Sequence, residues 1–493
     1  LNDELADYWG TPLVPTAAAR SPMNNVISTR TGETLDGAMR GLNYNVTDSR
    51  AESSQLFLRG DVTWNLAENV TLKNTIYGFD ANREWLNAEG YVYCTEVVDV
   101  CKEIGEVQRY YGYFFVFHDQ DLFGNRFTAQ FDFDLGGMEN SLLGGFETTS
   151  LEFERTRGFR RAEPQVAADA VDPYAPVPGI YGPEELRGIS PTEIKTSAFF
   201  LENSLQLSDR LSLVAAFRYE ELELDRLNFN SSGVREASSF ERDFDWTSWR
   251  IGSVLKLREN VAAYVQYSDA KDPINANIFL VSGGEDLDLT DAEQLEIGLK
   301  AVLPDPSIEA TIAYFDIQRD DVLEQIGVDR AAMVGGRESN GLEFTATWAA
   351  SEQLNIGINA AQTNAEFSRS TNFQNFAGNT PPNVPERTTN IWTSYDFGST
   401  PLQIGAAIRT VSDRFGDNAN NITLKSYSLI DAFASWKRNN VIVSARVNNA
   451  LDEEYLPWSD VFYLGQNDPG FIYANQLMLG SPRTYEISVA ASF

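Results

Sequence analysis

A chain of 493 residues with a formal net charge of −33 is a poor partner for nucleic acid, because phosphate binding needs basic patches that displace counterions. No stretch approaches the ~18 consecutive apolar residues of a membrane helix, which excludes a helical membrane protein. No linker divides the chain after about residue 50, so one long repetitive element fits better than several domains.

Alternation of apolar and polar side chains with a period of two predicts strands along most of the chain. The alternation is clear in Gln55–Leu66, Asn125–Leu135, Glu293–Ala301, Gln353–Ala360 and Leu402–Arg409. One face of each segment can therefore meet lipid while the other meets water. About 17 strands are predicted in this way, near 53–66, 70–84, 125–135, 140–155, 193–207, 210–225, 243–257, 260–269, 291–303, 307–319, 337–348, 353–367, 387–396, 402–412, 425–437, 440–449 and 482–493.

The connections between these strands alternate between short and long. The short ones are Ala67–Asn69, Gly136–Glu139, Ser208–Asp209, Arg258–Glu259, Pro304–Pro306, Ala349–Glu352 and Lys437–Asn439. The long ones are Leu86–Gly124, Gly158–Pro191, Leu227–Glu241, Lys271–Thr290, Asp321–Gly335, Arg369–Val384 and Trp458–Ser481. Outer-membrane barrels place tight turns in the periplasm and long loops outside. The order therefore predicts an all-β fold, a transmembrane antiparallel β-barrel of the outer-membrane type.

The inward faces of the predicted strands are polar and partly charged. They cannot form a dry core, because unpaired buried charges are costly, so the lumen holds water or a polar plug. Residues 104–119 are also strand-like, but a membrane strand there would break the order of connections, and we interpret them as an extension of the first complete outer loop. Aromatic residues near strand ends predict an interfacial girdle, formed by Trp64, Trp85, Tyr219, Trp246, Trp249, Tyr267, Trp348, Trp392 and Trp436.

The two ends of the chain predict an incomplete barrel. A bacterial single-chain barrel has an even number of strands, whereas the predicted number is odd. Residues 1–493 are therefore expected to form part of a barrel domain, with 1–52 as an outer-loop segment that leads into the first strand. Leu1–Gly10 lacks the basic region and apolar core of a signal peptide. A partial sheet would leave unpaired edges in lipid, so we expect no stable transporter from this piece alone.

The two cysteines, Cys94 and Cys101, both fall in the first long loop. Their spacing suits a loop-stapling disulfide in an oxidising compartment, with a pair of reduced thiols as the alternative. The only histidine, His118, is distant in sequence, so no metal site is expected. No paired nucleophile and base stand out, which speaks against an enzyme and leaves a structural role for His118.

Several short stretches carry a further pattern. In chain order they are Gly10-Thr-Pro-Leu-Val-Pro15, Leu295-Glu-Ile-Gly-Leu-Lys300, Arg337-Glu-Ser-Asn-Gly-Leu-Glu343, Asn383-Val-Pro385 with Trp392 and Tyr395, Val447-Asn-Asn-Ala-Leu-Asp452 with Tyr455, and Leu479-Gly-Ser-Pro-Arg-Thr484 with Phe493. In order and spacing these stretches resemble motifs of the barrel of TonB-dependent siderophore receptors. Ala450-Leu451, where that family has Leu-Phe, is a conservative departure.

The resemblance implies a fold, a function and partners. The family has a plug domain, a TonB box and a barrel of about 22 strands, of which this chain resembles only the barrel portion. It implies energy-coupled import of a ferric siderophore across the outer membrane, driven by the TonB–ExbB–ExbD complex through an N-terminal segment that is missing here. Iron would arrive chelated, so no cofactor is expected. Outer-membrane lipid, lipopolysaccharide and the barrel assembly machinery are further expected partners. The residues that resemble the C-terminal assembly signal are Tyr485, Ile487, Val489 and Phe493.

Candidate ligand contacts come from the first two long loops. They are Tyr91, Tyr93, Tyr110, Tyr111, Tyr113, Arg157, Arg160 and Arg161. Aromatic walls suit flat, anionic chelates, and guanidinium groups pair with anionic oxygens. Ordinary loop packing and solvated charge are the alternative for these residues. For the whole protein, a TonB-dependent receptor for another scarce solute, such as a cobalamin or a glycan, and a passive porin-like barrel stay open.

Overall fold

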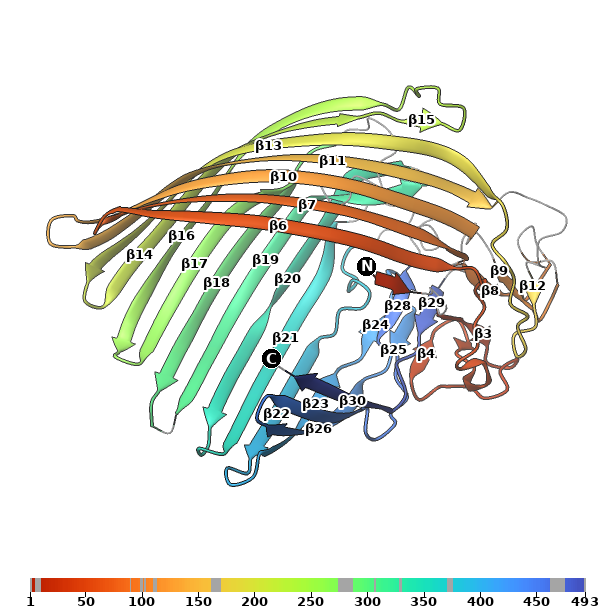
Figure 1. The fold of residues 1–493 in the computed structure, drawn as a ribbon. Coiled ribbons are helices and arrows are strands. Elements are labelled where there is room, and N and C mark those ends of the chain that lie inside the picture. Colours follow the sequence, from red (N-terminus) through yellow and green to blue (C-terminus); the bar gives the residue numbers. More distant parts are fainter. Residues whose placement is uncertain are drawn as a thin grey trace.

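A computed structural model describes residues 2–4, 10–88, 90–97, 101, 103–109, 113–160, 170–273, 287–305, 307–327, 330–369, 376–461 and 475–491. Within these residues one antiparallel sheet has 19 strands, which confirms the predicted fold class. The strands follow one another around a strongly curved wall (Figure 1). Short turns close the hairpins at one end of this wall, and the small sheets gather at the other end (Figure 1). No helix in the described part of the chain is long and apolar enough to cross a membrane.

Two strands of the main sheet are short, β1 (Asn2–Glu4) and β15 (Phe229–Asn230). The others correspond one to one to the strands predicted from the alternation. They are β6 (Arg50–Ala67), β7 (Val70–Ala88), β10 (Tyr113–Asp134), β11 (Glu139–Arg160), β13 (Glu184–Ser208), β14 (Leu211–Arg226), β16 (Phe240–Arg258), β17 (Val261–Asp272), β18 (Thr290–Leu303), β19 (Ile308–Gly327), β20 (Arg330–Ala349), β21 (Leu354–Arg369), β22 (Arg387–Asp396), β23 (Leu402–Val411), β26 (Tyr427–Arg438), β27 (Val441–Asn448) and β30 (Thr484–Ala491).

The prediction for residues 104–119 was wrong in part. Strand β10 begins at Tyr113 and pairs with β7 from Tyr113–Ala88 onward, so this region continues the wall and does not extend a loop. Both faces of this part of β10 lie above the lipid, so its alternation of apolar and polar residues is weak. Cross-strand hydrogen bonds nevertheless keep it in the sheet. The structure also adds a short turn at 397–401 and a long connection at 412–426, which complete the alternation of turns and loops.

The outward face carries an apolar belt. Phe127, Phe146, Phe199 and Tyr219 stand directly opposite one another on β10, β11, β13 and β14. Large apolar side chains on this face are exposed to the surroundings, as expected for contact with lipid.

Above the belt, the same face carries a row of carboxylates that we call the carboxylate ladder. Its members are cross-strand neighbours on six strands, Asp80, Asp121, Glu152, Glu193, Asp225 and Glu241. Lys195 pairs with Glu193 at 2.6 Å. The ladder marks where each of these strands leaves the apolar layer.

The predicted aromatic girdle was wrong for three residues. The register places Trp85, Trp246 and Trp392 on the inward face, and Trp246 is only 6% exposed. Trp392 lies over Gly357, where an added Cβ would come within 2.2 Å of the indole. The period-two alternation predicts an aromatic residue near a strand end, but it cannot distinguish the lipid-facing side of a strand from the lumen-facing side when both sides carry aromatic residues.

The outer loops form a layer of small sheets around residues 10–49. This layer contains β2 (Thr11–Pro12), β3 (Val14–Pro15), β4 (Ile27–Thr29), β5 (Glu33–Thr34), the 3-10 helix η1 (Gly37–Met39), β8 (Tyr91–Tyr93), β9 (Val107–Arg109), β12 (Ala170–Val171), β24 (Arg414–Phe415), β25 (Ile422–Leu424), β28 (Trp458–Val461) and β29 (Asn475–Met478). Strand β2 pairs with β29, and β4 pairs with β25. Residues 10–49 therefore join loops that lie far apart in the sequence.

Candidate functional site

The inward face of the wall carries an ionic network at mid-height. A Glu147 carboxylate oxygen lies 3.3 Å from Arg218 and 3.5 Å from Arg126, and the Tyr77 hydroxyl donates to this carboxylate over 3.2 Å. Arg218 also pairs with Glu220 at 2.7 Å. Charges satisfied in this way suit a lumen that holds water or polar contacts.

Positive charge gathers on the inward face above this network. Arg83, His118 and Arg155 stand directly opposite one another on β7, β10 and β11. Burial, followed by the charges of Arg83 and Arg155, lowers the pKa of His118 to about 4. The His118 ring, whose centroid lies 5.0 Å from that of Phe153, is therefore neutral near pH 7 and separates two guanidinium groups.

Arg226, the last residue of β14, is fully buried, with 0% of its surface exposed. Its Nη1 donates to Thr192 Oγ1 over 2.9 Å, whereas Nε and Nη2 have no hydrogen-bond acceptor among the described residues. Burial and the nearby charge of Arg157 lower the pKa of Arg226 to about 10, so the side chain stays protonated near pH 7. A buried charge with one hydrogen bond is costly, which marks this position as electrostatically unusual.

A hollow of about 300 Å³ lies beside Arg155, Arg157 and Arg187, and we call it the arginine pocket. A register shift between Arg157 and Gly158 leaves Arg187 as an extra residue on β13, and such a bulge redirects a side chain. Ser190 Oγ donates to Asn228 Oδ1 over 2.8 Å at the wall of the pocket. The lining residues are Arg155, Arg157, Arg187, Gly188, Ser190, Asn228, Phe229 and Glu236.

The predicted loop aromatics lie elsewhere. Tyr91 is 1% exposed, and its ring centroid lies 5.8 Å from that of Tyr44 in a core of the loop layer. Tyr93 packs against the same core. Cys94 and Cys101 form a disulfide, with Cα atoms 5.4 Å apart. These residues stabilise the loop layer, and the structure does not bring the two tyrosines into the arginine pocket.

The predicted arginines separate in the structure. Arg157 lines the pocket, whereas Arg160 pairs with Glu184 in the sheet register at the end of β11. Tyr113 begins β10, but its side chain is not among those described. The predictions for Tyr110, Tyr111, Arg161 and Phe493 lie outside the described residues.

Three basic residues of the site were missed from the sequence, namely Arg155, Arg187 and Arg226. Arg155 could have been identified from the sequence, because it shares the odd-numbered face of β11 with Glu147 and Arg157. Identifying Arg226 as part of the site requires the register between β13 and β14, and identifying Arg187 requires knowledge of the bulge. Neither leaves a mark in the local alternation of the sequence.

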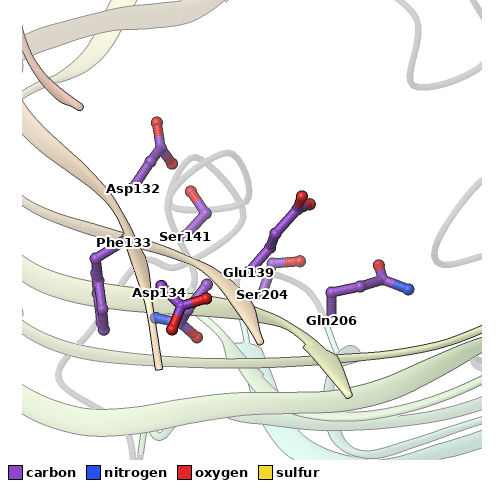
Figure 2. A pocket seen from close by; sticks show the side chains of 8 residues that line it. Asp132, Phe133, Asp134, Glu139, Ser141, Ser204 and Gln206 are labelled. Atoms are coloured by element: carbon purple, nitrogen blue, oxygen red, sulfur yellow. The ribbon is translucent and has the colours of Figure 1, made fainter. Parts of the chain in front are cut away.

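Other hollows in the described part of the chain contain several carboxylates in their lining, and two of them are described here. One of about 370 Å³ lies beside the short turn between β10 and β11, where Asp132, Asp134 and Glu139 surround it (Figure 2). Another of about 610 Å³ lies between β20, β21 and two outer loops, with Glu338, Glu366 and other carboxylates in its lining. The lining of the second hollow also includes Arg414, which is only 4% exposed.

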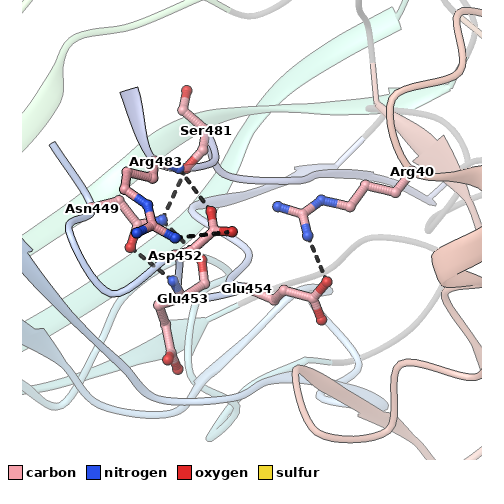
Figure 3. A network of polar contacts seen from close by, with 7 residues as sticks. All are labelled: Arg40, Asn449, Asp452, Glu453, Glu454, Ser481 and Arg483. Carbon is pink, nitrogen blue, oxygen red and sulfur yellow. Dashed lines mark hydrogen bonds and ion pairs between the residues drawn. The ribbon is translucent and has the colours of Figure 1, made fainter. Parts of the chain in front are cut away.

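The two C-terminal motifs of the sequence meet in one network (Figure 3). Asn449 Nδ2 donates to the carbonyl oxygens of Glu453 over 2.9 Å and Ser481 over 3.1 Å, and its Oδ1 accepts from the Glu453 N–H over 2.8 Å. Asp452 accepts from the Arg483 N–H over 2.8 Å. Arg40, from the N-terminal segment, forms an ion pair with Glu454 (Figure 3). The motifs thus fasten the base of the last outer loop.

Comparison with known proteins identifies the family. Residues 7–450 match the family described as TonB dependent receptor-like, beta-barrel. The ferrichrome outer membrane transporter/phage receptor of Escherichia coli K12 is 26% identical over 420 residues, which cover 79% of this chain and 52% of that protein. The ferrioxamine receptor of Yersinia enterocolitica is 24% identical over 323 residues, 62% of this chain and 44% of that protein. The chain therefore spans about half the length of these curated relatives.

Solved structures share the fold. The siderophore receptor PiuA from Acinetobacter baumannii superposes with a TM-score of 0.79 at 17% identity, over 99% of this chain and 70% of that one. The ferric-catecholate import receptor Fiu from E. coli K12, in its closed form, gives a TM-score of 0.77 at 17% identity, over 98% and 70%. With its lipid-facing barrel wall, the chain belongs to the TonB-dependent receptor family of β-barrels in the bacterial outer membrane.

Proposed function

We propose that this chain is the barrel portion of a receptor that imports a ferric siderophore across the outer membrane by TonB-coupled active transport. Arg157 and Arg160, at the mouth of the wall, are proposed ligand contacts. Iron is the cargo and arrives chelated. Coupling would use the TonB–ExbB–ExbD complex, and assembly would use the exposed strand with Tyr485, Ile487 and Val489.

The observation that carries the proposal is family membership over residues 7–450, in a chain whose wall bears a polar, partly cationic inner face. Curated relatives include a ferrichrome transporter and a ferrioxamine receptor. An energy-coupled importer needs a ligand site on the outer side of the membrane, and the arginine pocket lies on that side, above the apolar belt.

Uptake of radioactive iron by cells that depend on this receptor tests the proposal. Iron-starved cells carrying the complete receptor are expected to accumulate iron from a ferric siderophore, and deletion of the TonB gene is expected to abolish accumulation. Uptake that survives loss of TonB would instead support a passive porin-like barrel. Binding of cobalamin or a glycan, with no binding of any ferric chelate, would support a receptor for another solute.

A further inference from the structure

The wall changes height between β21 and β22 (Figure 1). Strand β21 has 16 residues, whereas β22 has 10. The two strands pair only as far as Gln362 and Arg387, and above that point the connection that precedes β22 bonds to β21 instead, for example from the Phe367 N–H to the Asn379 carbonyl oxygen. The hollow of about 610 Å³ lies at this change of height, and we call it the step pocket.

The step pocket lies at the upper boundary of the lipid layer. Glu338 and Asn340 of β20 line it, and they share the outward face of that strand with Leu342, which is 48% exposed in the apolar belt. Glu366 and Asn364, their direct cross-strand neighbours on β21, line it as well. About 9–11 tilted residues cross the hydrocarbon layer, and counting from the turn end of β20 places both pairs at its upper edge. Lipid head groups lie at this depth.

Four exposed carboxylates line the step pocket, those of Glu338, Glu366, Glu386 and Asp413. Glu338 and Glu366 stand directly opposite each other, and like charges in that position destabilise a sheet. Neither glutamate forms an ion pair within the described residues, so a bound cation would relieve the repulsion. No three metal-ligating side chains converge in that part of the chain, and the pattern therefore suits an organic ammonium, which has several N–H donors, better than a metal ion.

The step pocket also contains a buried cation. Arg414, which lines the pocket, is only 4% exposed. Its Nη2 donates to the Leu456 carbonyl oxygen, whereas Nη1 has no acceptor among the described residues. The nearby charge of Asp413 attracts Arg414 but supplies no hydrogen bond to Nη1. An anionic oxygen in the pocket would complete the bonds of this guanidinium. The pocket therefore offers both signs of charge.

The carboxylate ladder provides a contrast on the same face of the wall. A hollow of about 370 Å³ lies along it, and its lining includes Asp121, Glu152 and Glu193 but no basic residue. Carboxylates at this depth are thus not enough to form a pocket of mixed charge. The step pocket differs from the ladder in its buried guanidinium.

We propose that the step pocket binds the phosphoethanolamine head group of an outer-membrane lipid, with the ammonium at Glu338 and Glu366 and the phosphate at Arg414. The acyl chains of this lipid would lie along the apolar belt below, beside Leu342. A head group with a phosphate and no ammonium would be repelled by the four carboxylates. The volume of about 610 Å³ is in the range of small-molecule sites. The inference does not depend on the proposed import function.

Native mass spectrometry of the complete receptor tests the inference. The receptor in detergent is incubated with equal amounts of phosphatidylethanolamine and phosphatidylglycerol that carry the same acyl chains. We expect one tightly held phosphatidylethanolamine per receptor, with an affinity about tenfold or more above that for phosphatidylglycerol, because hydrogen bonds to charged groups are strong enough to give that factor. Glycerophosphoethanolamine should displace this lipid. Ethanolamine and glycerol phosphate, which each lack one of the two charges, should need about tenfold higher concentrations or more.

Variants separate head-group recognition from folding. The double variant Glu338→Gln/Glu366→Gln is expected to lose about tenfold in affinity for phosphatidylethanolamine. Arg414→Gln is expected to abolish the advantage of glycerophosphoethanolamine over ethanolamine as a competitor. Asp121→Asn/Glu152→Gln is the matched control, because it removes another cross-strand pair of outward carboxylates, on β10 and β11, and should keep the wild-type affinity. Heat-modifiable electrophoretic migration verifies that each variant is folded.

The outcomes are distinct. Loss of the phosphatidylethanolamine preference in the double variant, with the control intact, supports the inference. A folded double variant that keeps the preference overturns it, as does a wild-type receptor that holds phosphatidylglycerol equally well. Displacement of the lipid by Mg²⁺ but not by glycerophosphoethanolamine would indicate a divalent-cation site and would also overturn it. Iron uptake, measured separately in cells with and without TonB, decides the import proposal whichever lipid result is obtained.

Discussion

Replacing Asn449 by alanine should open the base of the last outer loop. The Asn449 side chain is buried and makes three hydrogen bonds, to Glu453 N–H, Glu453 C=O and Ser481 C=O. Each buried backbone group left without a partner costs about 1–3 kcal/mol. Asn449 also has φ of 48°, in the left-handed region, where alanine costs about 1–2 kcal/mol more. The local free energy of opening should therefore fall by about 3 kcal/mol or more.

Hydrogen–deuterium exchange of peptides that cover 450–456 and 479–483 measures this opening. A loss of about 3 kcal/mol accelerates exchange by about two orders of magnitude in these peptides and leaves the hairpin of β16 and β17 unchanged. Asn449→Gly is the matched control, because glycine accepts φ of 48° without strain and isolates the hydrogen bonds. Wild-type protection in Asn449→Gly would refute the reasoning, since the side-chain bonds would then contribute nothing to the closure of the loop.

Three further predictions concern the wall and the loop layer. The pKa of His118 falls from 6.5 to about 4 on folding, so the folded protein binds fewer protons than the unfolded chain between these pH values, and its stability should decline as pH falls through that window. Thermal melts of His118→Gln should lack this acid dependence. An unchanged pH profile in the variant would contradict the assignment. Gly357→Ala places a Cβ 2.2 Å from the Trp392 indole, so the ring must move. The expected result is a drop in stability of about 1–3 kcal/mol and altered tryptophan fluorescence. Wild-type values of both quantities would contradict the contact. Removal of the Cys94–Cys101 disulfide by the Cys94→Ser/Cys101→Ser change should accelerate protease cleavage near 94–107 by about tenfold or more, while equal cleavage would mean that packing alone holds this segment.

The membrane-crossing parts of the fold were predictable because their signal is local. Lipid requires an apolar residue at every second position, so each crossing strand displays its own alternation, whatever its partners are. Gln55–Leu66 and Glu293–Ala301 were identified in this way and lie within β6 and β18. Above the lipid this requirement ends. Residues 113–124 stay in β10 because β7 and β11 bond to them on both sides, which the sequence of β10 alone does not reveal.

The site was predictable only in part, for a related reason. The alternation of β11 places Arg157 with Glu147 on the inward face, but the neighbours of Arg157 come from β13 and β14. Their heights depend on register, and a shift of one residue reverses every face. The role of Tyr91 could not be decided from the sequence for a different reason. A loop tyrosine is equally suited to contact a ligand or to fill a small core, and here residues 10–49 supply that core.

The height of the wall has a mechanical consequence. Strand β13 has 25 residues, whereas about 9–11 tilted residues cross the hydrocarbon layer. More than half of that strand is thus hydrogen-bonded sheet outside the lipid, and such a sheet cannot spread sideways without breaking bonds along its whole length. The perimeter of the entrance is therefore inextensible, and a bulky solute cannot gain entry by stretching it. Any adjustment to solute size must come from the segments fastened above the rim, which move by opening a few contacts.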